Sequence, residues 1–143
     1  MDWCEQQKLL VIAAIGNNGI KAACFPARIG KVVCVTGLEQ DNTKAWFSNW
    51  ESSADVAAPS TGFASQFWDG TLAVWSGTSF ASPVVVGAVA DCLRRLPNVQ
   101  APDTIRKALK SAGTNIDNQN PNYKGNLGYL INHTRLDQTL RKP

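Results

Sequence analysis

The stretch WSGTSFASP, residues 75–83, marks the point where a strand gives way to a helix. The apolar run LAVW (72–75) leads into it, and VVVGAVADCLRRL follows it. From Thr78 to about Leu96, apolar residues fall on nearly all sides of the first three helical turns, which predicts a helix buried in the middle of a domain. Pro83 is compatible with this helix because it falls near the start.

The other apolar runs predict a parallel sheet. Two of them, at 9–15 and 32–36, lack the alternation of a half-exposed sheet, so we expect these two strands to be covered on both faces, as in a parallel sheet. The predicted strands are LLVIAAI (9–15), VVCVT (32–36, closed by Gly37), DVAAP (55–59), LAVW (72–75) and GYLIN (128–132). Two more helices are predicted, over 102–112 and over TRLDQTL (134–140). The fold class is therefore α/β, a mostly parallel sheet flanked by helices.

Composition describes one globular domain and excludes several classes of function. The chain has 143 residues, of which 44% are hydrophobic and 17% charged, enough to bury a real core. Its net charge of +3 is spread along the chain without a basic block, so nucleic acid is not an expected partner. No apolar run reaches membrane-spanning length, so a membrane is not an expected partner either. The N-terminal MDWCEQQK has no basic region or cleavage site of a signal peptide, and looks like the tail of a helix.

The chain has four cysteines and one histidine, and their spacing limits the metal sites and disulfides that it can form. None of Cys4, Cys24, Cys34 and Cys92 forms a C-x-x-C pair, and His133 is far from all of them, so no metal ligands are assigned. Cys34 and Cys92 lie in apolar runs, where buried thiols are usual. Spacing alone does not decide whether Cys24 and Cys34 form a disulfide.

Ser79 lies where catalytic chemistry is favourable. The first N–H groups of a helix are unpaired and carry the positive end of its dipole, so a hydroxyl there can attack a carbonyl while backbone N–H groups hold the oxyanion. The alternative is that Thr78 or Ser79 only caps the helix. Asn17 changes this balance, because AAIGNNG (13–19) places its side-chain amide directly after a strand, where it can donate to an oxyanion.

Five motifs, taken in order, resemble the C-terminal half of subtilisin-like serine peptidases. They are AAIGNNG (13–19), CFPA (24–27), VVCVTG (32–37), SGTSFASP (76–83) and YKGNLGYLIN (123–132). The serine motif is the most specific of them, and the resemblance covers roughly residues 5 to 140. Residues 1–143 are therefore expected to form the C-terminal portion of such a peptidase domain.

The resemblance implies a role for several residues. Ser79 would be the nucleophile, Asn17 the side-chain oxyanion donor and the Ser79 N–H the second donor. The primary specificity pocket would be lined by Ala14, Ile15 and Gly16, with Cys24 near its floor. A polypeptide substrate is implied, and an extracellular location if a signal lies upstream. No cofactor is assigned, although domains of this family can bind structural calcium.

One absence separates this chain from the family pattern. The catalytic aspartate and histidine of the family lie upstream of the asparagine motif, and no counterpart is found here, so we expect an upstream segment or chain to supply them and the isolated chain to be inactive. Two alternatives stay open. One is a non-catalytic remnant that binds peptides or a partner chain. The other is an α/β-hydrolase-type esterase, since Ser79, Asp103 or Asp117, and His133 follow the order of that class.

Overall fold

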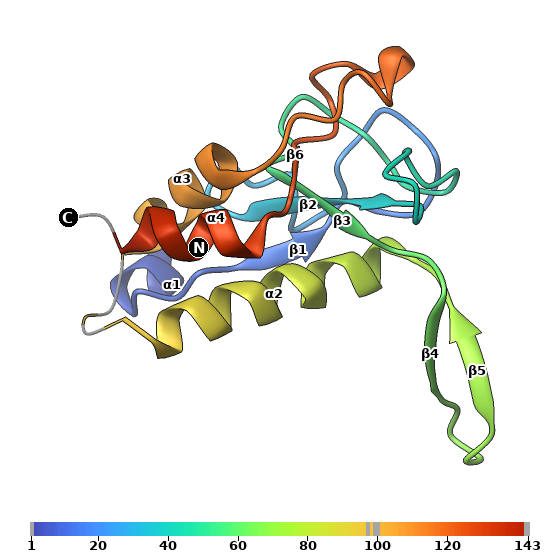
Figure 1. Ribbon diagram of the computed structural model, residues 1–143, viewed down its shortest axis with the longest axis horizontal. Coiled ribbons are helices and arrows are strands. Elements are labelled where there is room, and N and C mark those ends of the chain that lie inside the picture. Colours follow the sequence, from blue (N-terminus) through green and yellow to red (C-terminus); the bar gives the residue numbers. More distant parts are fainter. Residues whose placement is uncertain (1, 97, 99–100, 142–143) are drawn as a thin grey trace.

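A four-stranded parallel sheet forms the centre of the molecule in the computed structural model, which describes residues 2–96, 98 and 101–141 (Figure 1). Its strands, in spatial order, are β1 (Ile12–Ala14), β2 (Val33–Leu38), β3 (Val56–Pro59) and β6 (Tyr129–Leu130). All three neighbouring pairs run parallel, with Ala13 opposite Cys34 and Ala57 opposite Leu130. The predicted α/β class with a mostly parallel sheet is confirmed.

Three helices cover one face of this sheet. They are α2 (Thr78–Arg94), α3 (Pro102–Ala112) and α4 (His133–Leu140). Val33, Val35 and Val56 point toward them and share one apolar core with helical residues such as Val85 and Leu109. Loops cover the other face, where Cys34 packs with Ile15 and where Ala57 packs with Leu127. The short helices α1 (Asp2–Gln6) and η1 (Pro121–Tyr123) lie outside these layers.

The central strand β2 is longer than predicted, and the edge strand β1 is shorter. Gly37 lies inside β2 instead of closing it. A side chain does not fit at this position, because a β-carbon at Gly37 would lie 2.6 Å from Ser60 Oγ. Only Ile12–Ala14 of the predicted 9–15 run forms a strand, and these residues are half-buried. Among the described residues β1 pairs with β2 alone, so one of its edges has no neighbouring strand.

The helix α2 buries one face instead of all sides. Its buried residues are Thr78, Ala81, Val85, Val89 and Cys92, which face the sheet. On the opposite side Pro83, Gly87 and Ala90 are exposed, and Val86 is 46% exposed. Within the described residues, the prediction of a helix buried in the middle of a domain is therefore wrong, because its outer side is exposed.

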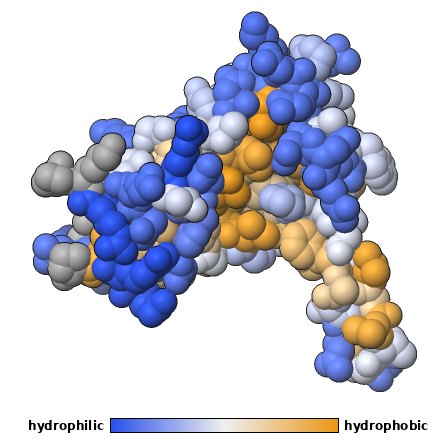
Figure 2. Space-filling view, viewed as in Figure 1, coloured by the Kyte–Doolittle hydropathy of each residue, from blue (hydrophilic) through white to orange (hydrophobic). Residues whose placement is uncertain are grey.

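A two-stranded antiparallel hairpin projects from the body of the molecule (Figure 1). LAVW forms β5 (Leu72–Trp75) as predicted, but it pairs with β4 (Phe63–Gln66), which the sequence had not indicated. Trp68, Leu72 and Val74 are highly exposed on this hairpin, and Figure 2 shows apolar colour along it. Its base packs against the start of α2, where Phe63 stacks on Phe80 with ring centroids 5.5 Å apart.

A buried carboxylate joins α3 to the sheet. Asp55, directly before β3, is fully buried and accepts hydrogen bonds from the Cys34 N–H at 2.9 Å and from Arg106 Nη2 at 3.0 Å. Lys110 Nζ lies 2.8 Å from the same carboxylate, and Arg106 also donates to the Gly30 carbonyl. Arg106 and Lys110 of α3 are thereby attached to the N-terminal ends of β2 and β3.

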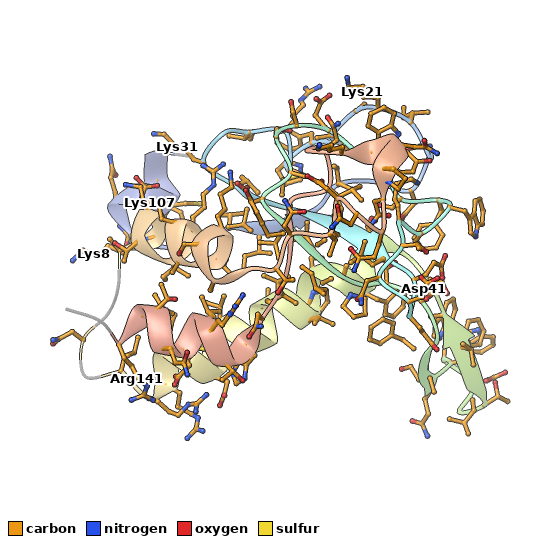
Figure 3. All side chains as sticks on the ribbon, turned by 45° about the horizontal axis from the view of Figure 1, so that its top comes forward. Lys8, Lys21, Lys31, Asp41, Lys107 and Arg141 are labelled. Atoms are coloured by element: carbon orange, nitrogen blue, oxygen red, sulfur yellow. The ribbon has the colours of Figure 1, made fainter. Side chains whose placement is uncertain are left out.

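Charged side chains are otherwise distributed around the periphery. Those labelled in Figure 3, among them Lys21, Lys107 and Arg141, come from different elements and do not form one basic patch. The four cysteines are free thiols; Cys34 and Cys92 are buried, as predicted. Among the described residues, none of the helices combines the length and apolar character needed to cross a bilayer.

Candidate active site

Ser79 is the second residue of α2 and is exposed at its N-terminal end. The chain reaches this position through Gly77, whose N–H donates to the Ser60 carbonyl at 2.8 Å. Space beside Gly77 is limited: a β-carbon there would lie 3.1 Å from Ser79 Oγ and 3.7 Å from Asn17 Nδ2. The serine hydroxyl and the asparagine amide therefore face the same small space beside the glycine.

The loop after β1 carries Asn17 to this position. Gly16 has a φ of +121°, which is strained for any residue with a side chain, and a β-carbon there would lie 2.6 Å from both Cys24 Sγ and Asn49 Nδ2. The buried Asn49 fixes the loop, because its Oδ1 accepts from the Asn18 N–H at 2.8 Å and its N–H donates to the Gly16 carbonyl at 2.9 Å.

The orientation of the Asn17 amide is set by Thr78. Asn17 Oδ1 accepts from both the Thr78 N–H and the Thr78 hydroxyl, each at 2.8 Å. Since the oxygen is engaged on this side, the Nδ2 donor is directed to the other side and is available to an acceptor. The interpretation of Thr78 or Ser79 as a simple N-cap is wrong: Gly77 holds the cap position, and the capping acceptor comes from Asn17, 61 residues earlier.

The residues predicted to line a specificity pocket lie together near β1. The Cys24 N–H donates to the Ile15 carbonyl at 2.9 Å, and the Cys24 thiol is exposed beside Gly16. Ile15 is fully buried, with its side chain in the core beside Ala27, so only its backbone can face a ligand. Ala14 and Gly16 are half-buried. Their role in substrate binding stays a prediction.

A separate cavity of about 620 Å³ opens beside Asn17, and we call it the Asn17 cavity. It is lined by Asn17, Glu39, Trp46, Phe47, Thr61, Ser76 and Gly77. Trp46 is 81% exposed and packs edge-on against Phe47, with ring centroids 5.5 Å apart. The cavity thus combines aromatic walls, one carboxylate and the amide of Asn17.

Lys44 supports the wall formed by Trp46 and Phe47. Its ammonium donates to the carbonyls of Ala45 and Ser48, each at 2.8 Å, and to the Trp46 carbonyl at 3.3 Å. Burial lowers the pKa of Lys44, while the charge of Glu39 acts in the opposite direction. The Lys44 ammonium therefore stabilises the backbone of the turn at residues 45–48. No sequence motif had indicated this role.

The only histidine of the chain, His133, is the first residue of α4 and contacts the C-terminal part of α2, far from Ser79. His133 Nε2 is 2.9 Å from Asp91 Oδ2, close to Arg95. Asp91 is about 18 Å along the helix from Ser79, at about 1.5 Å of rise per residue. Direct proton transfer across this length is impossible, so the geometry does not support the esterase arrangement of Ser79 with His133.

No metal centre accompanies these residues. Within residues 2–96, 98 and 101–141, no group of three or more His, Cys, Asp or Glu side chains is placed to hold a metal ion. The described residues bring together the Ser79 hydroxyl, the Asn17 amide and the N-terminal N–H groups of α2, and none of them places a base in hydrogen-bonding contact with the serine hydroxyl.

Known proteins are similar in sequence to most of the chain. The model of the subtilase family matches residues 1–129. Subtilisin BL from Lederbergia lenta is 36% identical over 115 residues, which cover 78% of this chain and 41% of that protein. Halolysin from Haloferax mediterranei is 39% identical over 108 residues, which cover 75% of this chain and 20% of that protein.

Solved structures agree with the sequence comparisons. The prenylagaramide maturation protease PagA is 25% identical with a TM-score of 0.87, over 97% of this chain and 53% of that one. The chain spans about half the length of that structure and less than half of the two curated relatives. The matched residues include Asn17, in the loop after β1, and Ser79, in α2. This chain therefore belongs to the subtilase family.

Proposed function

We propose that the chain carries the nucleophile and the oxyanion-binding groups of a subtilisin-like serine endopeptidase. In a complete enzyme, Ser79 Oγ attacks the carbonyl carbon of a peptide bond and passes its proton to a histidine. The leaving amine takes that proton as the C–N bond breaks, which leaves an acyl-enzyme on Ser79. Water then hydrolyses the ester and restores the serine.

The observation that supports this proposal best is the orientation of the Asn17 amide. Thr78 engages Asn17 Oδ1 through two hydrogen bonds, and Asn17 Nδ2 faces the space that also receives Ser79 Oγ. The Ser79 N–H lies at the positive end of α2. A carbonyl oxygen in that space would meet two donors that are already in position, which is how oxyanion stabilisation lowers the barrier.

Under this proposal, residues 1–143 form the C-terminal portion of the catalytic domain, and a segment outside them supplies the aspartate and histidine. The substrate is a polypeptide, and the complete enzyme acts outside the cell. His133 does not replace the missing base, since it is bonded to Asp91 at the other end of α2. The 143-residue chain alone is therefore expected to be inactive.

A fluorophosphonate probe tests the missing base. We expect the isolated chain to react with the probe no faster than its Ser79→Ala variant, because an unassisted serine is a weak nucleophile. Mass spectrometry of the labelled peptide measures this. Rapid labelling of Ser79 in the isolated chain would show that the 143 residues contain their own base.

The role of Asn17 is tested in a polypeptide extended by the segment that carries the aspartate and histidine. Loss of the side-chain oxyanion donor in subtilisin itself costs about 100- to 1,000-fold in turnover, and we expect the same order for Asn17→Ala, with little change in KM. Asn18→Ala is the matched control and should retain nearly full kcat. Equal kcat values for the two variants would remove Asn17 from the site.

A non-catalytic remnant that binds peptides is the second candidate, and the Asn17 cavity is the observation that favours it. The extended polypeptide separates the two. Peptide hydrolysis that is lost in Ser79→Ala supports the endopeptidase, whereas peptide binding that is unaffected by Ser79→Ala, without hydrolysis, supports the remnant.

A further inference from the structure

The Asn17 cavity carries one charged side chain among its lining residues, that of Glu39. Glu39 directly follows β2 and is half-buried. Its backbone is fixed, since its N–H donates to the Thr43 carbonyl at 2.8 Å and its carbonyl accepts from the Asn42 N–H at 3.1 Å. Among the described residues, however, its carboxylate forms no hydrogen bond or ion pair, so a half-buried negative charge faces the cavity without a direct partner.

The neighbouring cation, Lys44, attracts the Glu39 charge through space but forms no hydrogen bond with its carboxylate. The Lys44 ammonium donates to the carbonyls of Ala45, Trp46 and Ser48, and it lies over the Tyr123 ring at 4.9 Å from the centroid. An ammonium has only three N–H donors, and all three are used by these carbonyls. No N–H donor of Lys44 is thus left for the Glu39 carboxylate, which can accept hydrogen bonds from a cationic ligand.

The walls fit the rest of such a ligand. Trp46 is exposed and held edge-on against Phe47, so the cavity offers aromatic surface beside the carboxylate. Aromatic faces attract cations, and they also cover the methylene stems of long basic side chains. A lysine or arginine side chain has both parts, an apolar stem for the aromatic wall and a charged head for Glu39.

We propose that the Asn17 cavity binds a basic side chain, lysine or arginine, of the polypeptide substrate. Asn17 and Gly77 line the cavity, so its occupant lies next to Ser79. Ala14, Ile15, Gly16 and Cys24 do not line it, so it is a second recognition position beside the predicted specificity pocket. This inference rests on the proposed function, because it assigns a substrate to the same site.

Matched peptides test the charge directly. The probes are alanine-glycine octapeptides with a single arginine placed at each position in turn, and the same peptides with citrulline, which keeps the shape of arginine without its charge. Amide shifts of Asn17 and Gly77 in NMR titrations of the 143-residue chain report binding at the cavity. We expect the best arginine peptide to bind about tenfold more tightly than its citrulline counterpart, the usual order for a hydrogen bond to a charged group.

Three variants decide whether Glu39 is responsible. Glu39→Gln should abolish the preference for arginine, and Glu39→Lys should shift it to glutamate peptides. Glu51→Gln makes the same charge change at a residue that does not line the cavity, and should keep the wild-type preference. Equal binding of the arginine and citrulline peptides to the wild-type chain, no binding of either, or a preference that survives Glu39→Gln would overturn the inference.

These outcomes are separable from failure of the proposed function. The assignment of Ser79 and Asn17 is tested by turnover of the extended polypeptide, which does not depend on a basic residue in the substrate. Loss of turnover in Asn17→Ala together with an unchanged charge preference in Glu39→Gln would retain the catalytic assignment and reject the basic subsite.

Discussion

At the scale of the residue, Cys34 makes the stability of the fold depend on pH. Burial, and secondly the neighbouring Asp55 charge, raises the pKa of the Cys34 thiol from 9.0 to about 12. In the unfolded chain the thiol ionises near its ordinary pKa, so above about pH 9 the unfolded state binds fewer protons than the folded one. The contribution of Cys34 is fully present below pH 9 and is lost as the pH rises toward 12.

The variant Cys34→Ala should reveal this loss. Its deficit in free energy of unfolding relative to the wild type should shrink above pH 9, by up to about 1.4 kcal/mol per pH unit. Urea titrations at several values between pH 8 and 10.5 measure it. Val35→Ala, which truncates a buried apolar side chain in the same strand, should have a constant deficit over this range. A constant deficit for Cys34→Ala as well would refute the prediction.

Single residues also show what the sequence can and cannot indicate about the site. Ser79 and Asn17 could be selected because each lies in a specific motif at the end of an element. Thr78, Asn49 and Lys44 could not, because their roles depend on hydrogen bonds whose partners are fixed only by the tertiary fold. Thr78 is the clearest case: it looked like a local cap, and its partner is a side chain 61 residues away.

At the scale of the element, α3 is held to the sheet by a buried charge as well as by apolar packing. Ile105 and Leu109 bury its apolar face, while Arg106 and Lys110 reach Asp55. Asp55 is fully buried, whereas the two cations are partly exposed. Removing the carboxylate therefore leaves the Cys34 N–H and two cations without their acceptor, a change that is costly in a buried network.

We expect Asp55→Ala to lower the free energy of unfolding by about 3 kcal/mol, the lower end of the range for a broken buried pair, because water can reach both cations. Chemical denaturation with circular dichroism measures the change. Asp103→Ala, in the exposed first turn of the same helix, is the control and should cost below about 1 kcal/mol. A similar decrease in the free energy of unfolding for Asp55→Ala and Asp103→Ala would mean that the Asp55 network stabilises the fold no more than an exposed carboxylate does.

The elements differ in how well their sequences predicted them. The helix at 102–112 has the predicted bounds, because proline at its start, glycine past its end and an amphipathic pattern all agree. The hairpin β4–β5 was found only in part, since FASQ has neither the apolar run nor the clear alternation that marks a strand. Gly37 was misread as a strand end because glycine is common where strands end, while the reason for glycine here, the close approach of Ser60, comes from a residue distant in sequence.

At the scale of the whole molecule, two features, one apolar surface and one strand edge, have no partner within the described residues. The outer side of α2 exposes Pro83, Val86 and Ala90, and the edge of β1 lacks a neighbouring strand. The chain covers about half of the solved structure PagA, so the proposed missing segment of the domain is a natural partner for both features. The pattern of α2 predicted burial on all sides, which fits a complete domain better than these residues alone.

Val86→Glu tests whether the proposed missing segment covers the outer side of α2. In the 143-residue chain Val86 is 46% exposed, so the substitution should change the free energy of unfolding by less than about 0.5 kcal/mol. In the extended polypeptide the same charge would be buried, and we expect a loss of several kcal/mol together with loss of activity. Thermal melts of both forms measure this, with Val85→Glu, on the buried face, as a control that is destabilising in both.

The bond from Asn17 to Thr78 has a consequence for the order of events when the protein is heated. Because the donor amide is oriented by a helix that belongs to another part of the chain, it is correctly placed only while α2 is docked on β1. A small separation of α2 from β1 would release the Asn17 amide from its fixed orientation before the rest of the core unfolds. In the complete enzyme, catalytic activity would then be lost at a lower temperature than helical structure, and thermal inactivation would report on the contact between α2 and β1.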